Sequence, residues 1–171
     1  MKMLKKLLAI VLTGAMALTL LTACGGNAVN DKNIADALND MAKGSLATYT
    51  FKSRTNEQAM AKAIAALSES ERHKTEKVMK ILELDEDGAN KNNFVWWGAV
   101  IADEIGTAGQ AYNVMDKILS KDAVNADKLT DKKPGDIRYI GTALGTMTFP
   151  DGQKTVRFIV VTAEAEPVDK K

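Results

Sequence analysis

The C-terminal third of this 171-residue chain most constrains its fold. Residues 137–149 and 155–165 are rich in β-branched and aromatic side chains, which favour extended backbone. Pro150-Asp151-Gly152 lies between the two runs. Proline presets the backbone angle at the second position of a turn, and glycine accepts the left-handed conformation that follows. The pattern predicts a long β-hairpin.

Two further features indicate a sheet around this hairpin. Residues 46–53 alternate between apolar and polar side chains, which predicts a half-buried strand. Gly141 and Gly145 lie on one face of the first hairpin strand. Glycines in that position predict either the close approach of a helix or a β-bulge.

Helical spacing of apolar residues recurs before the hairpin. Residues 31–43 follow it and end at Gly44, and residues 55–67 and 68–84 each begin with a capping sequence, at Thr55 and Ser68. An amphipathic helix is also expected at residues 112–119. Residues 120–136 are charged and contain Pro134-Gly135, so we expect a surface loop there.

Residues 94–102 are apolar without an evident polar side. We interpret this run as a buried central helix, on which Trp96 and Trp97 point about 100° apart. Either tryptophan is a candidate for lining a ligand site, and packing in the core is the alternative. Together these patterns predict one α+β domain over residues 31–171, with several helices packed on a small antiparallel sheet.

The N-terminus carries a different kind of signal. Lys2, Lys5 and Lys6 precede an apolar stretch over residues 7–21, and Leu21-Thr22-Ala23-Cys24 follows. A basic start, a short apolar run and a small residue before a cleavage site are typical of a secretory signal peptide. The last four residues resemble the lipobox of bacterial lipoproteins. That resemblance implies removal of residues 1–23 and a diacylglycerol on the sulfur of Cys24.

Such an anchor would determine where the protein resides. The apolar stretch of about fifteen residues is short of the roughly twenty that a membrane-spanning helix needs. We therefore expect the membrane to be contacted through the lipid on Cys24, with residues 24–30 as a flexible tether. The expected location is the bacterial cell envelope, facing the periplasm or the exterior. The alternative is an ordinary signal peptide in which Cys24 has no such role.

Composition narrows the chemistry that the domain can perform. Removing Lys2, Lys5 and Lys6 with the leader leaves 20 of the 23 basic side chains against 22 acidic ones, a net charge of about −2. No basic cluster predicts a nucleic-acid partner. Cys24 is the single cysteine and His73 the single histidine, on a charged segment. We expect no disulfide, no metal site and no cofactor.

Acidic residues are the remaining candidates for chemistry. Residues 83–88 resemble the first half of a calcium loop, but Phe94 stands where a bidentate Glu is needed, which favours a solvated turn. Asp103 and Glu104 directly follow the apolar run. They are candidates for binding or for acid–base chemistry. The alternative is that they mark the point where a buried element reaches water.

The segment from Asp103 onward resembles the CAP (cysteine-rich secretory protein) superfamily. Asp103-Glu104-Ile105-Gly106 stands where that family has Glu-Asn-Ile-Ala, and residues 138–145 resemble its Gly-rich strand. The family's paired histidines have no counterpart. The resemblance implies an α-β-α sandwich with a cleft that lacks its metal, and no site residue is carried over from it.

The leading functional hypothesis is a lipid-anchored, non-enzymatic module that binds an envelope protein or a small ligand, with Trp96, Trp97, Asp103 and Glu104 as candidate site residues. The first alternative is a degenerate CAP-like domain, or a hydrolase that uses Asp103 or Glu104. The second is a structural envelope protein that self-associates through the hairpin edge.

Overall fold

The computed structural model describes residues 29–44, 47–103 and 105–168. Their centre is a four-stranded sheet in the order β1-β3-β4-β2. The strands are β1 (Thr50–Ser53), β2 (Asn93–Ile101), β3 (Lys132–Phe149) and β4 (Gly152–Pro167). The predicted hairpin is confirmed: β3 and β4 pair antiparallel along their length, and Gly152 has a φ of +123° at the turn.

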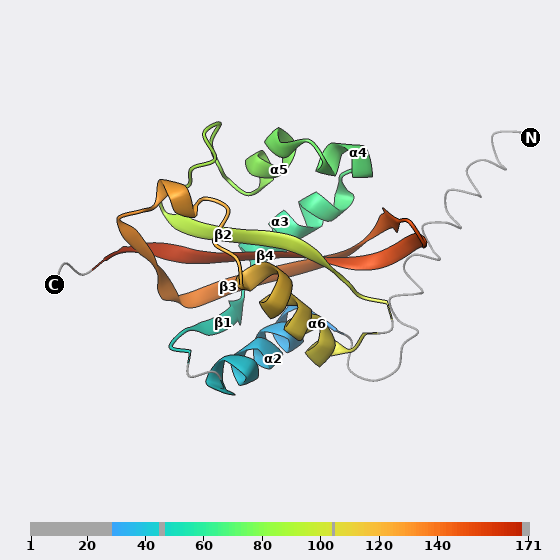
Figure 1. The fold of residues 1–171 in the computed structure, drawn as a ribbon, viewed down its shortest axis with the longest axis horizontal. Coiled ribbons are helices and arrows are strands. Elements are labelled where there is room, and N and C mark those ends of the chain that lie inside the picture. The colour runs from blue at the N-terminus through green and yellow to red at the C-terminus, as the bar shows by residue number, and fades with distance from the viewer. Residues whose placement is uncertain (1–28, 45–46, 104, 169–171) are drawn as a thin grey trace, which may run out of the picture.

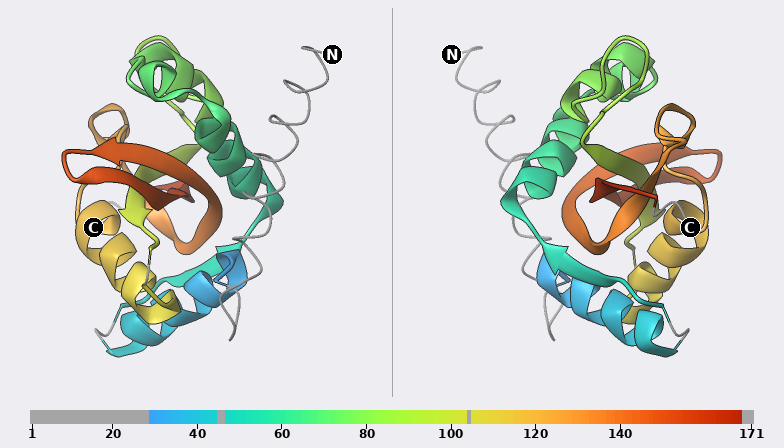
Figure 2. Two further views of the ribbon diagram at one scale, coloured as in Figure 1. Left: turned by 90° about the vertical axis from the view of Figure 1, so that its right-hand side faces the viewer. Right: turned by 90° about the vertical axis from the view of Figure 1, so that its left-hand side faces the viewer.

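Helices cover both faces of this sheet, as Figures 1 and 2 show. On one face lie α2 (Asp31–Gly44) and α6 (Thr107–Val114), the latter extended by a π-helical turn at Met115–Leu119. On the other lie α3 (Thr55–Ala66), α4 (Glu69–Arg72) and α5 (Thr75–Ile81). The prediction of an α+β domain is confirmed. No helix of the described residues is long and apolar enough to cross a membrane.

The sheet is mixed, where a wholly antiparallel one was expected. β1 pairs parallel with β3, in a register that sets Phe51 beside Arg138. One side of β3 is occupied by its hairpin partner, so β1 takes the other side. The long stretch of chain between β1 and β3 supplies the crossover that a parallel pair requires. The strand is also shorter than the 46–53 predicted, beginning at Thr50.

The prediction of a central helix at residues 94–102 was wrong. The segment forms β2, an edge strand in the sheet order, paired antiparallel with β4. Because helices cover both faces of the sheet, a strand here buries side chains on both sides, and a uniformly apolar run results. Trp96 packs on the α2 face and Trp97 on the α3 face. The two indoles therefore point in opposite directions.

Element boundaries differ from prediction in three other places. Arg54 is the N-cap of α3, and Thr55 is its first helical residue. The Ser68 capping box is confirmed, with Glu71 as its reciprocal partner, but the helix predicted over residues 68–84 is broken into α4 and α5. The predicted loop 120–136 ends early because β3 begins at Lys132. A register shift between Pro134 and Arg138 accommodates Pro134-Gly135 within the strand.

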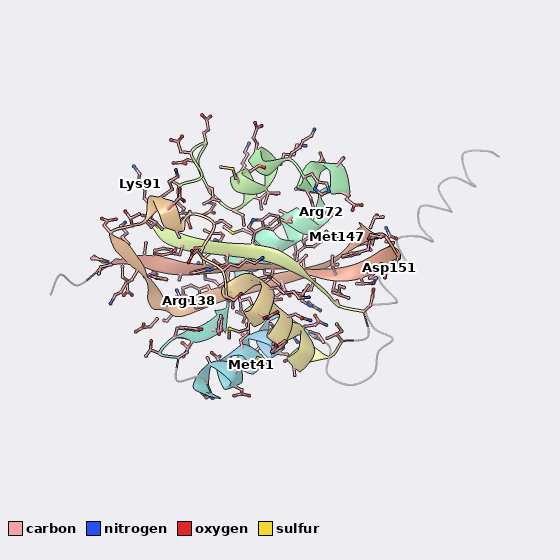
Figure 3. All side chains as sticks on the ribbon, viewed as in Figure 1. Met41, Arg72, Lys91, Arg138, Met147 and Asp151 are labelled. Carbon is pink, nitrogen blue, oxygen red and sulfur yellow. The ribbon has the colours of Figure 1, made fainter. Side chains whose placement is uncertain are left out.

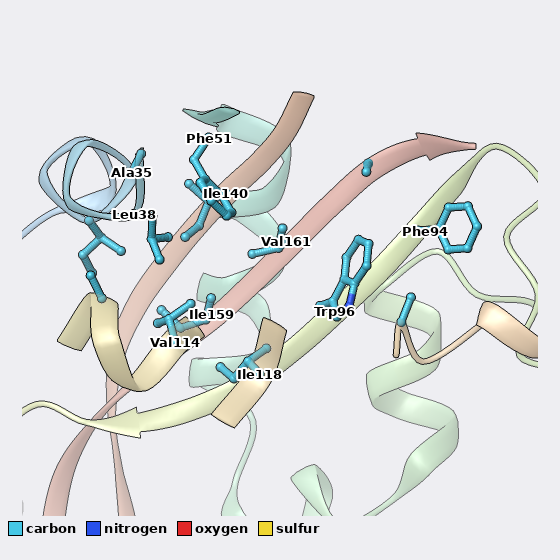
Figure 4. Close-up of a cluster of buried hydrophobic side chains, with 14 of the residues drawn as sticks. Ala35, Leu38, Phe51, Phe94, Trp96, Val114, Ile118, Ile140, Ile159 and Val161 are labelled. Atoms are coloured by element: carbon cyan, nitrogen blue, oxygen red, sulfur yellow. The ribbon is translucent and has the colours of Figure 1, made fainter. Parts of the chain in front are cut away.

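Two hydrophobic clusters, one on each face, hold the layers together. Figure 4 shows the cluster on the α2 side, which includes Leu38, Trp96 and Ile140. The cluster on the α3 side includes Ile64 and Phe158. Both clusters are formed by residues from position 29 onward. A chain that begins at residue 25 therefore retains both of them.

Glycine at 141 lets α3 approach the sheet, which is one of the two alternatives predicted. A Cβ at Gly141 would overlap the backbone of Glu57 and Gln58 in the first turn of α3. The first turn of that helix therefore rests directly on β3. This packing contact fixes the position of Arg54 and Glu57 relative to the sheet.

Candidate functional site

A polar groove of about 600 Å³ lies at the end of the sheet opposite the hairpin turn. Lys91 stands at this end and Asp151 at the turn (Figure 3). We call this cavity the polar groove. It is lined from the start of α3, the start of β2, the start of β3 and the end of β4 by Arg54, Asn56, Lys91, Asn92, Asn93, Lys132, Glu164 and Ala165.

Strand register brings these distant segments together. Asn93 at the start of β2 is paired with Glu164 near the end of β4. Lys132 starts β3, and its Nζ donates a hydrogen bond to the backbone oxygen of Lys91 at 2.8 Å. The groove therefore depends on contacts between segments far apart in the sequence, and no local motif encodes it.

Arg54 is held at the groove by a buried carboxylate. Its Nε donates to Oε2 of Glu57 at 2.7 Å and its Nη2 to Oε1 at 2.5 Å. The hydroxyl of Thr162 also donates to Oε1, at 2.7 Å. Glu57 is fully buried. Both oxygens of this carboxylate are therefore occupied, in the bidentate arrangement that fixes an arginine in one orientation.

The pKa of Glu57 reflects two opposing influences. Burial raises the pKa of the carboxyl, but the hydrogen bonds from Arg54 and Thr162 outweigh it, and the pKa lies below its ordinary value. The hydrogen bond to Glu57 raises the pKa of the Arg54 guanidinium. Both groups are charged at neutral pH. Glu57 is an ionised, fully bonded acceptor and not a proton carrier.

The rest of the Arg54 guanidinium is open to the groove. Its Cζ lies 3.8 Å from the centre of the Tyr139 ring, so the ring supports one face of the group. Nη1 makes no hydrogen bond to any described residue, and 35% of the side chain is exposed. Arg54 therefore presents an oriented pair of N–H donors that its own fold leaves unused.

Charge and donor type define what the polar groove can bind. Three cationic side chains line it against a single carboxylate, that of Glu164, together with three asparagine amides. The N-terminus of α3 reaches the groove without a side-chain cap, which adds positive partial charge. Cations and amides in this arrangement suit an anionic group accompanied by hydroxyls.

A second, smaller groove runs beside β2. Its volume is about 260 Å³, and we call it the edge groove. It is lined by Trp96, Trp97, Gly98, Ala99, Lys117, Ile118, Lys121, Asp122 and Val124. Trp96 is mostly buried, and its Nε1 donates to the backbone oxygen of Lys121 at 3.0 Å. Trp97 is half-buried and forms part of the groove wall.

Asp103, one of the two predicted acidic residues, lies outside both grooves. Asp103 is exposed, and its carboxylate accepts the backbone N–H of Thr155 at 2.7 Å, near the hairpin-turn end of the sheet. It is therefore separated from Trp96 and Trp97. Glu104 and Cys24 lie outside the described residues.

Two other sequence candidates have local roles. His73 is exposed and ends α4. Asp85 accepts the backbone N–H groups of Asp87 and Ala89, so its carboxylate is used by its own turn. Within the described part of the chain, no group of three or more Asp, Glu, His or Cys residues could hold a metal ion.

No family model, curated protein or solved structure matches this chain. Membership of the CAP superfamily stays a prediction, as does the lipobox.

Proposed function

We propose that this protein is a lipid-anchored component of the bacterial cell envelope that binds a small anionic, hydroxylated ligand in the polar groove. Sugar acids and phosphorylated sugars have this chemistry. The observation that supports the proposal is the arrangement of Arg54, which lines the groove: one side of its guanidinium is fixed by Glu57, and Nη1 has no hydrogen-bond partner among the described residues.

Binding is favoured over catalysis by the state of the acidic groups. Glu57 is ionised, buried and hydrogen-bonded to Arg54 and Thr162, so it has no proton to donate and no surface exposed to a substrate. Glu164 is the single carboxylate among the described lining residues. A lone exposed carboxylate beside cations and amides is better suited to ligand recognition than to paired acid–base chemistry.

The anchor we propose is a lipid on Cys24. The backbone oxygen of Val29 accepts a hydrogen bond from Arg157, and Asn30 caps α2 through its side chain. Val29 and Asn30, which the sequence assigned to the tether, therefore contact the folded domain. A fully extended chain from Cys24 to Val29 spans at most roughly 20 Å, so the domain would stay close to the membrane surface.

Anchoring can be tested separately from ligand binding. In cells expressing the full chain, replacing Cys24 with Ser should move the protein from the membrane fraction to the soluble fraction and abolish incorporation of a labelled fatty acid. Equal fractionation of the variant and the native chain would contradict a lipid anchor. This result would leave the polar groove unaffected.

Ligand binding is tested with a charge-matched pair of variants. Lys91→Gln removes a cation from the groove, whereas Lys154→Gln removes one that pairs with Asp151 beside the hairpin turn. In calorimetric titrations of the chain from residue 25 with glucose 6-phosphate, we expect Lys91→Gln to weaken binding several-fold and Lys154→Gln to leave it unchanged. Equal effects of the two variants would contradict a local site.

A further inference from the structure

The two edges of the sheet are protected to different extents. At the β1 edge, Oδ1 of Asn39 accepts the N–H of Phe51 at 2.6 Å, and Nδ2 donates to the oxygen of the same residue at 2.9 Å. An asparagine side chain thus takes the place of a neighbouring strand. Because β1 has four residues, this single residue covers the centre of its outer edge.

At the start of β2, an asparagine side chain again covers the outer edge of the strand. Oδ1 of Asn125 accepts the N–H of Val95 at 3.0 Å, and its Nδ2 donates to the oxygen of Asn93 at 2.8 Å. The N–H of Val124 donates to the oxygen of Val95 at 2.8 Å. The outward backbone groups of Asn93 and Val95 are therefore occupied.

After Val95, the outward backbone groups of β2 lose these hydrogen-bond partners. In an antiparallel ladder, alternate residues direct their backbone groups toward the partner strand. Since Val95 faces away from β4, so do Trp97, Ala99 and Ile101. No described residue hydrogen-bonds to the outward N–H or oxygen of these three. An open strand edge of this kind is a template for another strand.

The edge groove lies beside these open groups, and Trp97 and Ala99 line it. Ile118 packs over Gly98, where a Cβ would be 3.0 Å from its side chain, and closes the groove on the α2 side. Lys117 and Lys121 are exposed along the groove and have no ion-pair partner among the described residues. Asp122 is the single acid in the lining.

We propose that the edge of β2 from Trp97 to Ile101 binds an extended acidic peptide of a partner protein as a fifth strand. Backbone hydrogen bonds from the open edge would supply affinity, and Lys117 and Lys121 would select carboxylates. A second copy of this chain is the less suitable occupant, because a symmetric pairing of β2 edges would bring the two lysines of each copy together. The proposal is independent of the ligand in the polar groove.

Residue-resolved amide exchange tests this directly. In the chain from residue 25, the amides of Trp97, Ala99 and Ile101 should exchange fast and those of Gly98 and Val100 slowly. The probe is an eight-residue peptide of alternating Val and Glu, and the control peptide alternates Val and Lys. We expect the acidic probe to slow exchange at the three open amides at least tenfold, and the basic control to leave them unchanged.

Ala99→Pro provides the matched variant. The Ala99 N–H is not used within the sheet, so proline at this edge position should leave the fold intact while removing a donor and blocking the incoming strand. We expect native circular dichroism with loss of probe binding. Should the variant fail to fold, Lys117→Gln combined with Lys121→Gln is the second test, and it should weaken the acidic probe several-fold.

Four results would overturn the proposal: no protection by the acidic probe at millimolar concentration, equal protection by both peptides, retained binding by folded Ala99→Pro, or concentration-dependent dimerisation that protects the same amides without peptide. The last result would assign the edge to a second copy. None of these results bears on phosphate-sugar binding at the polar groove, which is measured separately.

Discussion

Two arginine networks lie on opposite faces of the sheet, and they differ in how many of the guanidinium nitrogens have a hydrogen-bond partner. On the α2 face, Arg157 is 5% exposed and each guanidinium nitrogen has a partner: Gln110, Thr142 and the backbone oxygen of Val29. On the α3 face, Arg54 is hydrogen-bonded to Glu57 on one side, and its Nη1 has no partner in the part of the chain that the structure describes.

This difference separates a structural role from a binding role. The Arg157 network is closed: Thr142 donates in turn to the Asp31 carboxylate, so the start of α2 is joined to the sheet. Burial lowers the pKa of Arg157, and the Asp31 charge partly offsets it. The Arg54 network uses its buried carboxylate to orient a cation at the surface. A closed network can stabilise only the fold, whereas an open one can also hold a ligand.

The largest expected effect comes from breaking the closed network. Arg157→Leu leaves Gln110, Thr142 and the Val29 oxygen without their shared partner in a buried position, and should lower the free energy of unfolding by about 3 to 5 kcal/mol. Urea denaturation of the chain from residue 25 measures this. A loss below about 1 kcal/mol would show that the network is not a structural anchor.

A substitution that displaces the first turn of α3 from the sheet should lower the free energy of unfolding nearly as much. Gly141→Ala places a methyl group against the backbone of Glu57 and Gln58, so the start of α3 has to move. We expect a loss of about 3 kcal/mol. Gly106→Ala is the matched control, because its Cβ would meet nothing within 4 Å. Similar midpoints for the two variants in denaturant would contradict direct packing of α3 on Gly141.

The Glu57 carboxylate should give the open network a characteristic pH dependence. The pKa of this carboxyl in the folded state lies below the ordinary 4.5. The stability that it contributes to the fold is therefore complete above the pKa of the unfolded chain, and is lost as pH falls through the pKa of the folded state. Glu57→Gln should cost about 1 to 3 kcal/mol at pH 7. The difference between native chain and variant should shrink toward pH 3, and a constant difference would contradict an ionised Glu57.

The smallest stability change is expected for a substitution that retains the charge of the open network. Arg54→Lys leaves a cation within reach of Glu57 but removes the planar fork, the Tyr139 stacking and the free Nη1. The variant should lose about 1 kcal/mol of stability while its affinity for glucose 6-phosphate falls about tenfold. Unchanged affinity would mean that a point charge suffices and that the fixed geometry of Arg54 is irrelevant to binding.

Sequence patterns predicted the elements whose signals are local. The hairpin followed from β-branched runs around Pro150-Asp151-Gly152, and α2 from helical spacing that ends at Gly44. The apolar run that forms β2 predicted a helix instead of a strand. Burial by helices on both faces removes the alternation of apolar and polar residues that normally identifies a strand. The parallel pairing of β1 depends on which side of β3 is vacant, which no local pattern encodes.

The candidate site was missed for a related reason. Arg54 and Glu57 are near neighbours in sequence, but their partner Thr162 and the stacked Tyr139 come from the distant hairpin. Three residues apart at a helix start, an arginine and a glutamate are ordinary surface residues, and only tertiary contacts reveal that Glu57 is buried. Trp97, a candidate from the sequence, lines the edge groove as a residue of an edge strand.

The most direct test of the open network is a residue-resolved NMR titration of the chain from residue 25 with glucose 6-phosphate and, separately, with glucose. We predict that glucose 6-phosphate shifts the backbone amides of Arg54, Asn93 and Glu164 in a saturable manner, while glucose produces far smaller changes at the same concentrations. Saturable shifts centred elsewhere, or equal responses to both sugars, would contradict the assignment of the polar groove as an anion-binding site.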